Sequence, residues 1–247
     1  MTPARSIVVL LVALATVSGL GYLGSQTVLA RPAVTLVHDH GWRNAPLPPS
    51  RRGVAPGEPI GPQQVDPAWV GRTAAATGIP APAVRAYADA QLGRPTGCDL
   101  GWTTLAGIGW VESHHGTIGG RALGGDGRSS RPILGPALDG GGGFAAIPAT
   151  PRTTTWHGDA RWDHAVGPLQ FIPSTWATWG TDGDGDGDAD PNDIDDAAAT
   201  AVRYLCADGH DLTTGSGWAD AVFSYNHARS YVAAVRAAAV AYAARTP

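Results

Sequence analysis

Residues 103–116 read Thr-Thr-Leu-Ala-Gly-Ile-Gly-Trp-Val-Glu-Ser-His-His-Gly. The spacing predicts a helix from Thr103 to about His114, in which Leu105, Ile108 and Glu112 recur every three or four positions and share one face. A carboxylate on an apolar face is costly unless it is paired or protonated, and desolvation raises its pKa towards the range of a general acid. Spacing alone leaves open the alternative of an exposed or arginine-paired Glu112 at a helix end.

The rest of the chain is rich in helix signals and poor in strand signals. Asp66 followed by Pro67 predicts a helix start, and Gly78 predicts the end of that helix. Further helices are expected at 82–92, 173–179, 196 to about 207, and 218 to about 244 with a break near Asn226. Residues 116–162 show no helix or strand period, which predicts a long functional or disordered loop. These alanine-rich helices indicate a mostly α fold.

The first thirty residues are typical of an export signal. Arg5 precedes an apolar run from Ile7 to Leu23, and small residues near Ala30 offer a cleavage site. The run is close to the lower length limit of a membrane span, so both a cleaved signal peptide and a retained N-terminal membrane anchor stay open. Residues 31–65, rich in Pro, Gly and Arg, predict a linker, and residues 66–247 predict one extracytoplasmic domain.

Composition narrows the function classes. The chain has 247 residues, a net charge of −4 and no basic stripe, so nucleic acid is not an expected partner. Only two glutamates occur, Glu58 in the Pro-rich segment and Glu112. Cys98 and Cys206 are the only cysteines, and a lone pair in an oxidising compartment is expected to form a disulfide. Two separate buried thiols are the alternative.

An aspartate-rich stretch gives the strongest local signal. Asp182, Asp184 and Asp186 fall at positions 1, 3 and 5 of an EF-hand-like calcium loop, with Gly187 at position 6 and the carbonyl of Asp188 at position 7. Carboxylate oxygens suit Ca²⁺, and no His or Cys ligand set indicates zinc. We therefore expect a structural calcium ion, with a solvated acidic turn as the alternative.

Three separated motifs, together with this loop, resemble the lytic murein transglycosylase B family. Gly107 to Gly116 resembles the Glu-Ser-x-x-Gly element of lytic transglycosylases and goose-type lysozymes. Gly167-Pro-Leu-Gln-Phe-Ile-Pro-Ser174 resembles their Gly-x-x-Gln-Phe-x-Pro-Ser element, and Ser224-Tyr225-Asn226 followed by Ser230-Tyr231-Val232 is the third match. The resemblance covers about residues 66–235. His114 departs from it, because the family often has a small or polar residue there.

The resemblance implies a lysozyme-like, monomeric enzyme that acts on the glycan strands of peptidoglycan. Glu112 would protonate the bond between N-acetylmuramic acid and N-acetylglucosamine and then act as base, giving a 1,6-anhydro product. The residues expected to bind substrate are Ser113, Gln170, Tyr204, Tyr225 and Asn226. The family's longer, fifteen-residue loop places the closing calcium ligand at Asp196, whereas a standard EF-hand loop would end at Asp193.

Several alternatives stay open at this point. Asp163 offers a second carboxylate, which would allow a hydrolytic muramidase that uses water. A non-catalytic cell-wall-binding module would need no acid at all. Independently of these functions, the alternative for Gln170 is a helix-start or backbone-tethering role, and the alternative for Tyr225 is packing in the core.

Overall fold

The computed structural model describes residues 46–50, 64–141 and 145–247. The predicted export signal lies outside the described residues, as does most of the predicted linker. Within the part that is described, none of the helices combines the length and the apolar composition needed to cross a membrane. At the linker's end Ser50 pairs with Val65, and the N–H of Asp66 donates to the carbonyl of Pro49 at 2.8 Å.

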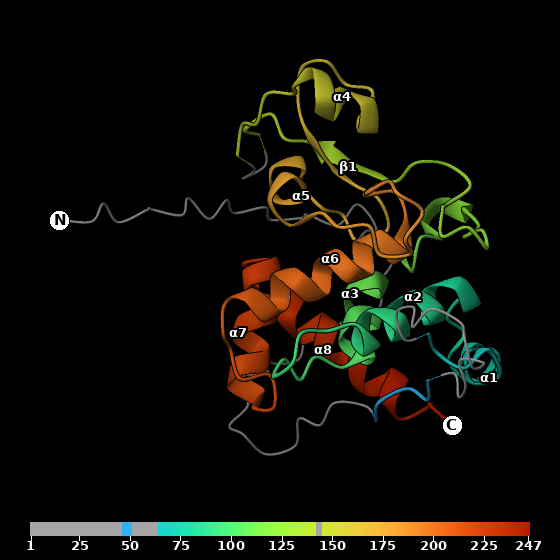
Figure 1. Ribbon diagram of the computed structural model, residues 1–247. Coiled ribbons are helices and arrows are strands. Elements are labelled where there is room, and N and C mark those ends of the chain that lie inside the picture. Colours follow the sequence, from blue (N-terminus) through green and yellow to red (C-terminus); the bar gives the residue numbers. More distant parts are fainter. Residues whose placement is uncertain (1–45, 51–63, 142–144) are drawn as a thin grey trace, which may run out of the picture.

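Six helices form the helical body, the lower part of the molecule in Figure 1. They are α1 (Pro67–Thr77), α2 (Ala81–Leu92), α3 (Trp102–Ser113), α6 (Ile194–Ala207), α7 (Gly215–Tyr225) and α8 (Arg229–Ala243). Helix α3 runs through the middle, and only Trp110 and Val111 of its twelve residues are not buried. Glu112 therefore lies on a helix that is enclosed on nearly all sides, rather than on one apolar face.

Close packing of α3 against α8 depends on Gly107. A Cβ atom at this position would lie 2.6 Å from the carbonyl oxygen of Val235 and 3.1 Å from its side chain. No side chain fits there, so the two helix backbones approach closely and α8 is held directly against the helix that carries Glu112.

The helix ends follow the predicted capping signals. The carboxylate of Asp66 accepts hydrogen bonds from the first turn of α1, and Gly78 ends that helix with a left-handed φ of 77°. The predicted break near Asn226 is also observed, because Asn226 is extended (φ −146°) between α7 and α8. Helix α6 begins two residues before the predicted start, since Asp193 caps it by accepting from the N–H of Asp195.

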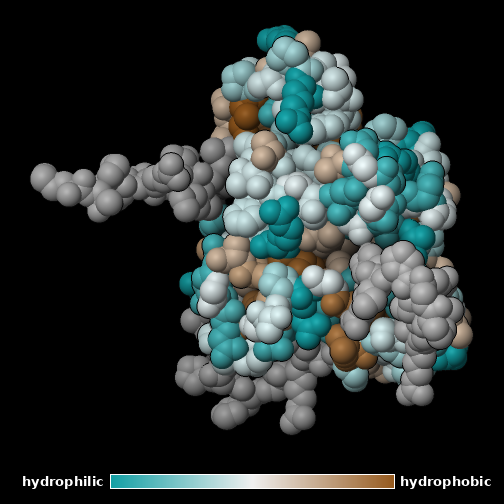
Figure 2. Space-filling view, in the orientation of Figure 1, coloured by the Kyte–Doolittle hydropathy of each residue, from teal (hydrophilic) through white to brown (hydrophobic). Residues whose placement is uncertain are grey.

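Residues 117–180 form an upper lobe, which is mostly hydrophilic on the face shown in Figure 2. Its elements are a 3₁₀ turn (Ile118–Gly120), β1 (Leu134–Ala137), α4 (Pro151–His157), β2 (His164–Val166) and α5 (Pro173–Trp179). Strands β1 and β2 pair antiparallel. The expectation that residues 116–162 lack regular structure was therefore wrong. Elements this short are set by tertiary pairing and give no readable period.

A disulfide links Cys98, just before α3, to Cys206 near the end of α6. The predicted pairing of the two cysteines is thus observed. It ties the segment before α3 to the end of α6, 108 residues away in the sequence.

Candidate active site

Glu112 lies in the last turn of α3 and is only 7% exposed. The hydroxyl of Tyr231, from the first turn of α8, donates a 2.7 Å hydrogen bond to Glu112 Oε1. Burial raises the pKa of Glu112 to about 7, and the bond from Tyr231 opposes that rise. The side chain therefore exchanges a proton in the range in which a group must act first as acid and then as base.

The chain turns sharply after Glu112 and Ser113. His114, His115 and Gly116 all adopt left-handed φ angles, of 52°, 59° and 84°. The ring of His115 is buried between two tyrosines, with Nδ1 3.2 Å from the Tyr87 hydroxyl and Nε2 2.8 Å from the Tyr242 hydroxyl. Burial lowers the pKa of His115 to about 3, so the ring stays neutral and fixes this turn by hydrogen bonding.

Ser113 connects the two lobes. Its hydroxyl donates to the carbonyl of Pro168 at 2.6 Å and accepts from the N–H of Gly116 at 2.8 Å. The side chain is fully buried. In this arrangement the hydroxyl of Ser113 holds the Gly167–Gln170 turn beside Glu112, and the role of Ser113 in binding substrate stays a prediction.

Gln170 lies in that turn with a left-handed φ of 52°. Its Nε2 donates to the carbonyl of Gly167 at 2.8 Å and to the carbonyl of Ile133 at 3.3 Å. Gly167 has φ 80°, and a Cβ there would lie 1.7 Å from the carbonyl oxygen of Pro191. The Nε2 of Gln170 thus tethers backbone, and the role of Gln170 in binding sugar stays a prediction.

Three tyrosines lead from the protein surface towards Glu112. The ring of Tyr204 meets Tyr225 edge-on, and Tyr225 is parallel to Tyr231, with ring centroids 6.4 Å apart. The hydroxyl of Tyr225 donates to the carbonyl of Leu169 at 2.8 Å, and that of Tyr204 to Ser224. The structure therefore gathers Glu112 with the predicted substrate residues Tyr204 and Tyr225.

Asn226 is 5% exposed and follows Tyr225 directly. Its Oδ1 atom is buried with no hydrogen-bond partner in the part of the chain that the structure describes. Asn226 lies at the predicted break, in the corner between α7 and α8. An acceptor in this position is available to an N–H or O–H group of a ligand.

Tyr231 is the residue that sequence reasoning missed. It was part of the third motif but was assigned no role, although it provides the hydrogen bond to Glu112. The two residues are 119 positions apart. The motif itself was the only available signal.

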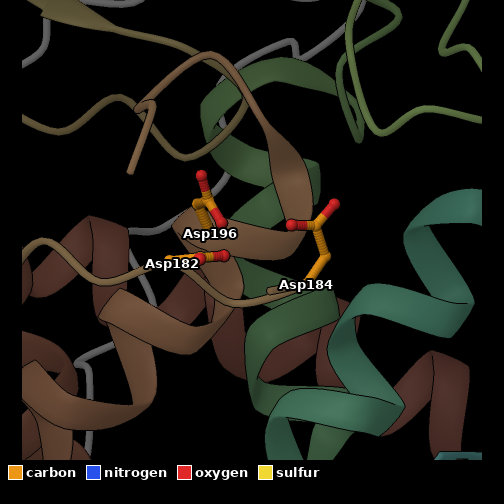
Figure 3. Close-up of side chains that lie close together, drawn as sticks. All are labelled: Asp182, Asp184 and Asp196. Carbon is orange, nitrogen blue, oxygen red and sulfur yellow. The ribbon is translucent and has the colours of Figure 1, made fainter. Parts of the chain in front are cut away.

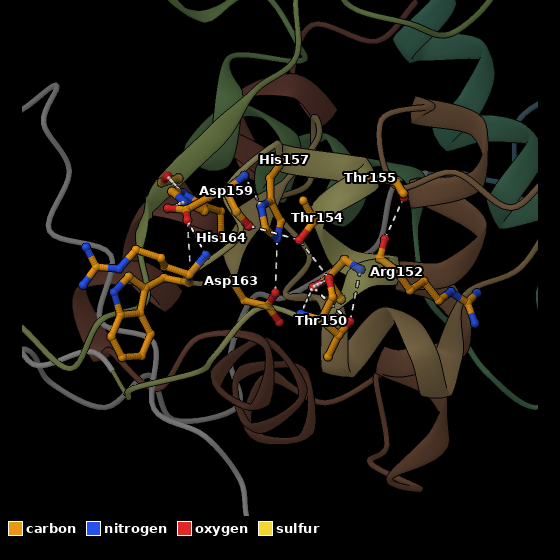
Figure 4. A network of polar contacts seen from close by, with 12 residues as sticks. Thr150, Arg152, Thr154, Thr155, His157, Asp159, Asp163 and His164 are labelled. Atoms are coloured by element: carbon orange, nitrogen blue, oxygen red, sulfur yellow. Dashed lines mark hydrogen bonds and ion pairs between the residues drawn. The ribbon is translucent and has the colours of Figure 1, made fainter.

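Asp163, the predicted alternative second carboxylate, belongs to a polar network in the upper lobe (Figure 4). Its Oδ1 lies 3.1 Å from Nε2 of His157, and both side chains are buried. The Nδ1 of His157 accepts from the N–H of Asp159, so its Nε2 carries the proton and donates to Asp163. Asp163 is thus occupied in holding α4 to β2.

The aspartate loop (residues 182–196) brings three carboxylates together. Asp182, Asp184 and Asp196 each have an oxygen within 4.8 Å of the others, and Figure 3 shows them around a common space. The N–H groups of Gly183 and Asp190 bond to the two oxygens of Asp196. Burial and the charges of Asp184 and Asp182 raise the pKa of Asp196 to about 6.

The other predicted loop ligands lie outside this cluster. Asp186 and Asp188 are exposed, and Asp193 instead caps α6. Oxygen donors alone form the cluster, which is the chemistry that Ca²⁺ prefers. Asp196, and not Asp193, belongs to this group of carboxylates.

Residues 153–222 match the family model described as the transglycosylase SLT domain. Comparison of the chain with curated proteins gave no match, and comparison with solved structures gave none either. The matched stretch includes the Gln170 turn, the aspartate loop and α6, but begins well after the helix of Glu112. It supports an assignment to the lytic transglycosylases. The mostly helical structure with its small sheet fits a lysozyme-like fold.

Proposed function

We propose that the chain is a peptidoglycan lytic transglycosylase of the murein transglycosylase B type, with Glu112 as its single acid and base. The observation that carries the proposal is the buried Glu112 carboxyl group, with its pKa raised to about 7 and its Oε1 held by Tyr231. The match to the transglycosylase SLT domain supports the same class from a different part of the chain.

In the first step protonated Glu112 donates its proton to the glycosidic oxygen between N-acetylmuramic acid and N-acetylglucosamine. The bond breaks with oxocarbenium-like character at the muramic acid C1. Burial keeps the carboxyl group protonated before this step, because the uncharged form is the one that a desolvated site stabilises. Tyr231 orients the carboxyl group through its bond to Oε1.

In the second step the Glu112 carboxylate takes the proton of the muramic acid C6 hydroxyl as that oxygen attacks C1. The product is a 1,6-anhydro sugar, and no water enters the reaction. The engagement of Asp163 with His157 favours this route over hydrolysis, because Asp163 is not free to activate water. Asn226 Oδ1 would accept a hydrogen bond from the sugar or its acetamido group.

The aspartate loop supports a structural calcium ion held by Asp182, Asp184 and Asp196. When bound, the ion would supply positive charge that offsets the repulsion among these carboxylates. The protein residues supply the frame, since two backbone N–H groups donate to the Asp196 carboxylate.

Such an enzyme acts outside the cytoplasm, where its glycan substrate lies. Residues 1–30 would deliver it there as a cleaved signal or a membrane anchor, and we expect it to act as a monomer. The rival functions are a hydrolytic muramidase and a catalytically silent wall-binding module.

Product analysis separates these three functions. Purified peptidoglycan is treated with the wild type, Glu112→Gln and Asp163→Asn, and the released fragments are weighed by mass spectrometry. The proposal expects anhydro products, lighter by one water than the reducing-end products, from the wild type and Asp163→Asn but not from Glu112→Gln. Reducing-end products that depend on Asp163 would indicate a muramidase. Binding without cleavage by all three proteins would indicate a wall-binding module.

A further inference from the structure

A short segment, Gly127 to Ser129, lies between the aspartate loop and the end of α3. It belongs to the stretch that the sequence left without structure, and no catalytic or binding role was expected of it. Its contacts extend in two directions.

On one side the segment is bonded to the C-terminal end of the aspartate loop. The carbonyl of Gly127 accepts from the N–H of Ile194 at 3.0 Å, and Arg128 pairs with Asp193 as an isolated bridge. The guanidinium of Arg128 forms an ion pair with Asp190, and its Nε lies 3.8 Å from Asp193 Oδ2. Asp190 is itself tied to the loop, because its N–H donates to Asp196 Oδ2 at 2.8 Å.

On the other side the segment is fastened to the turn that follows Glu112. The hydroxyl of Ser129 donates to the carbonyl of Gly116 at 2.8 Å. The N–H of Gly116 in turn donates to the hydroxyl of Ser113, the residue directly after Glu112. A continuous set of contacts therefore runs from Asp196 through Asp190, Arg128, Ser129 and Gly116 to Ser113.

We propose that Arg128 and Ser129 are positioning residues that link cation binding in the aspartate loop to the placement of Glu112. This inference rests on the proposed calcium site and on the proposed role of Glu112. Without a cation, the three clustered carboxylates repel one another and displace Asp196. When Asp196 moves, Asp190 and its ion-pair partner Arg128 move with it. Ser129 follows Arg128 in the chain, and its bond to Gly116 passes the movement to the turn after Ser113.

The structure offers a matched pair of serines for the test. Ser129→Ala removes the bond to Gly116. Ser130→Ala is the control, because the Ser130 hydroxyl accepts from the N–H of Ala122 within its own loop. Ser129→Thr keeps a hydroxyl and is expected to behave like the wild type.

Three measurements on the full chain follow. Calorimetry with calcium measures the affinity, which should stay within about twofold in all four proteins. Hydrogen exchange with and without calcium follows the amides of residues 113–117. We expect calcium to slow their exchange about fivefold or more in the wild type, Ser130→Ala and Ser129→Thr, and less than about twofold in Ser129→Ala. Calcium should also raise kcat in the first three proteins but not in Ser129→Ala, with KM little changed.

Two outcomes would overturn the proposal. One is a wild-type calcium response at residues 113–117 in Ser129→Ala, and the other is the absence of any calcium effect on these amides in the wild type. Hydrogen exchange needs no turnover, so failure of glycan cleavage would count against the proposed function alone.

Discussion

Ionisation of the buried Glu112 weakens the fold. The pKa of about 7 in the folded protein lies above the ordinary 4.5, so the folded chain holds this proton more tightly than the unfolded chain. This contribution to the free energy of unfolding is intact below about pH 4.5 and is lost as the pH rises towards 7. Glutamine cannot ionise, so Glu112→Gln does not lose this stability as the pH rises. We expect the variant to be more stable than the wild type at pH 8 by up to about 3 kcal/mol.

Urea unfolding at pH 5 and pH 8 checks this prediction. The difference between Glu112→Gln and the wild type should be small at pH 5 and large at pH 8. An equal difference at both values would show that the carboxyl group does not titrate in this range.

Tyr231→Phe changes the acid without removing it. The hydroxyl of Tyr231 lowers the pKa of Glu112, so its removal should raise that pKa and move the alkaline limb of kcat/KM to higher pH. Loss of orientation should reduce kcat by up to about a hundredfold. Tyr242→Phe is the control on the same helix, because its hydroxyl contacts His115. A limb that moves to lower pH, or moves equally in both variants, would contradict the prediction.

At this scale the sequence indicated Glu112 through its motif, but not what holds it. Tyr231 reaches Glu112 across 119 positions, and Ser113 reaches Pro168 across 55. Contacts of this kind arise from packing of α3 against α8 and the upper lobe, which local spacing does not encode.

Among the helices, Gly107 controls how closely α8 approaches α3. Gly107→Ala would press a methyl group on the backbone of Val235, and we expect it to lower stability by about 1–3 kcal/mol. Gly71→Ala is the control, because open space surrounds that position on α1 and alanine favours a helix by about 1 kcal/mol. Thermal unfolding of both variants measures the effects, which should have opposite signs. A Gly107→Ala protein as stable as the wild type would show that the helices can move apart.

Asp193 and Asp196 both lie at the start of α6 but have different contacts. Asp193 caps the helix, whereas Asp196 belongs to the carboxylate cluster. Chelation of calcium should lower the melting temperature of the wild type and of Asp193→Asn, since asparagine also caps helices well. It should leave Asp196→Asn unaffected, because that variant lacks a cluster carboxylate. A chelator response retained by Asp196→Asn but lost by Asp193→Asn would reverse the ligand assignment.

Helix starts and ends were the best predicted elements, because their signals are local. Asp66, Pro67 and Gly78 determine α1 by themselves. Helix α4 was missed even though Thr150 and Thr153 form a capping box at its start, since a seven-residue helix has too few turns to show a period. Strands β1 and β2 depend on each other, so neither could be recognised alone.

For the whole molecule, the disulfide is the longest-range covalent constraint. Cys98 and Cys206 are 108 residues apart, and a loop of this size is worth up to about 4–5 kcal/mol in the chain-entropy model. Urea unfolding with and without reductant should show a loss of this order in the wild type. A variant with both cysteines replaced by serine should have the lower free energy of unfolding of the reduced wild type, and reductant should not change it. A wild type that also ignores the reductant would contradict the prediction.

The order of the lobes along the chain was only partly readable. A mostly α domain followed from composition and capping, whereas the upper lobe was taken for a loop. The upper lobe is separate from the helical body because Pro168 comes back beside the end of α3. Only the three-dimensional arrangement shows this.

That return has a consequence for how such a protein can vary. After Ser113 the chain runs through most of the upper lobe before it returns beside the end of α3 at Pro168, and a 2.6 Å hydrogen bond connects the two points. A stretch whose ends already touch can be lengthened, trimmed or exchanged at little entropic penalty to the rest of the fold. We therefore expect changes of length between these two points to be tolerated best at positions away from Ser129, whose hydroxyl bonds to Gly116.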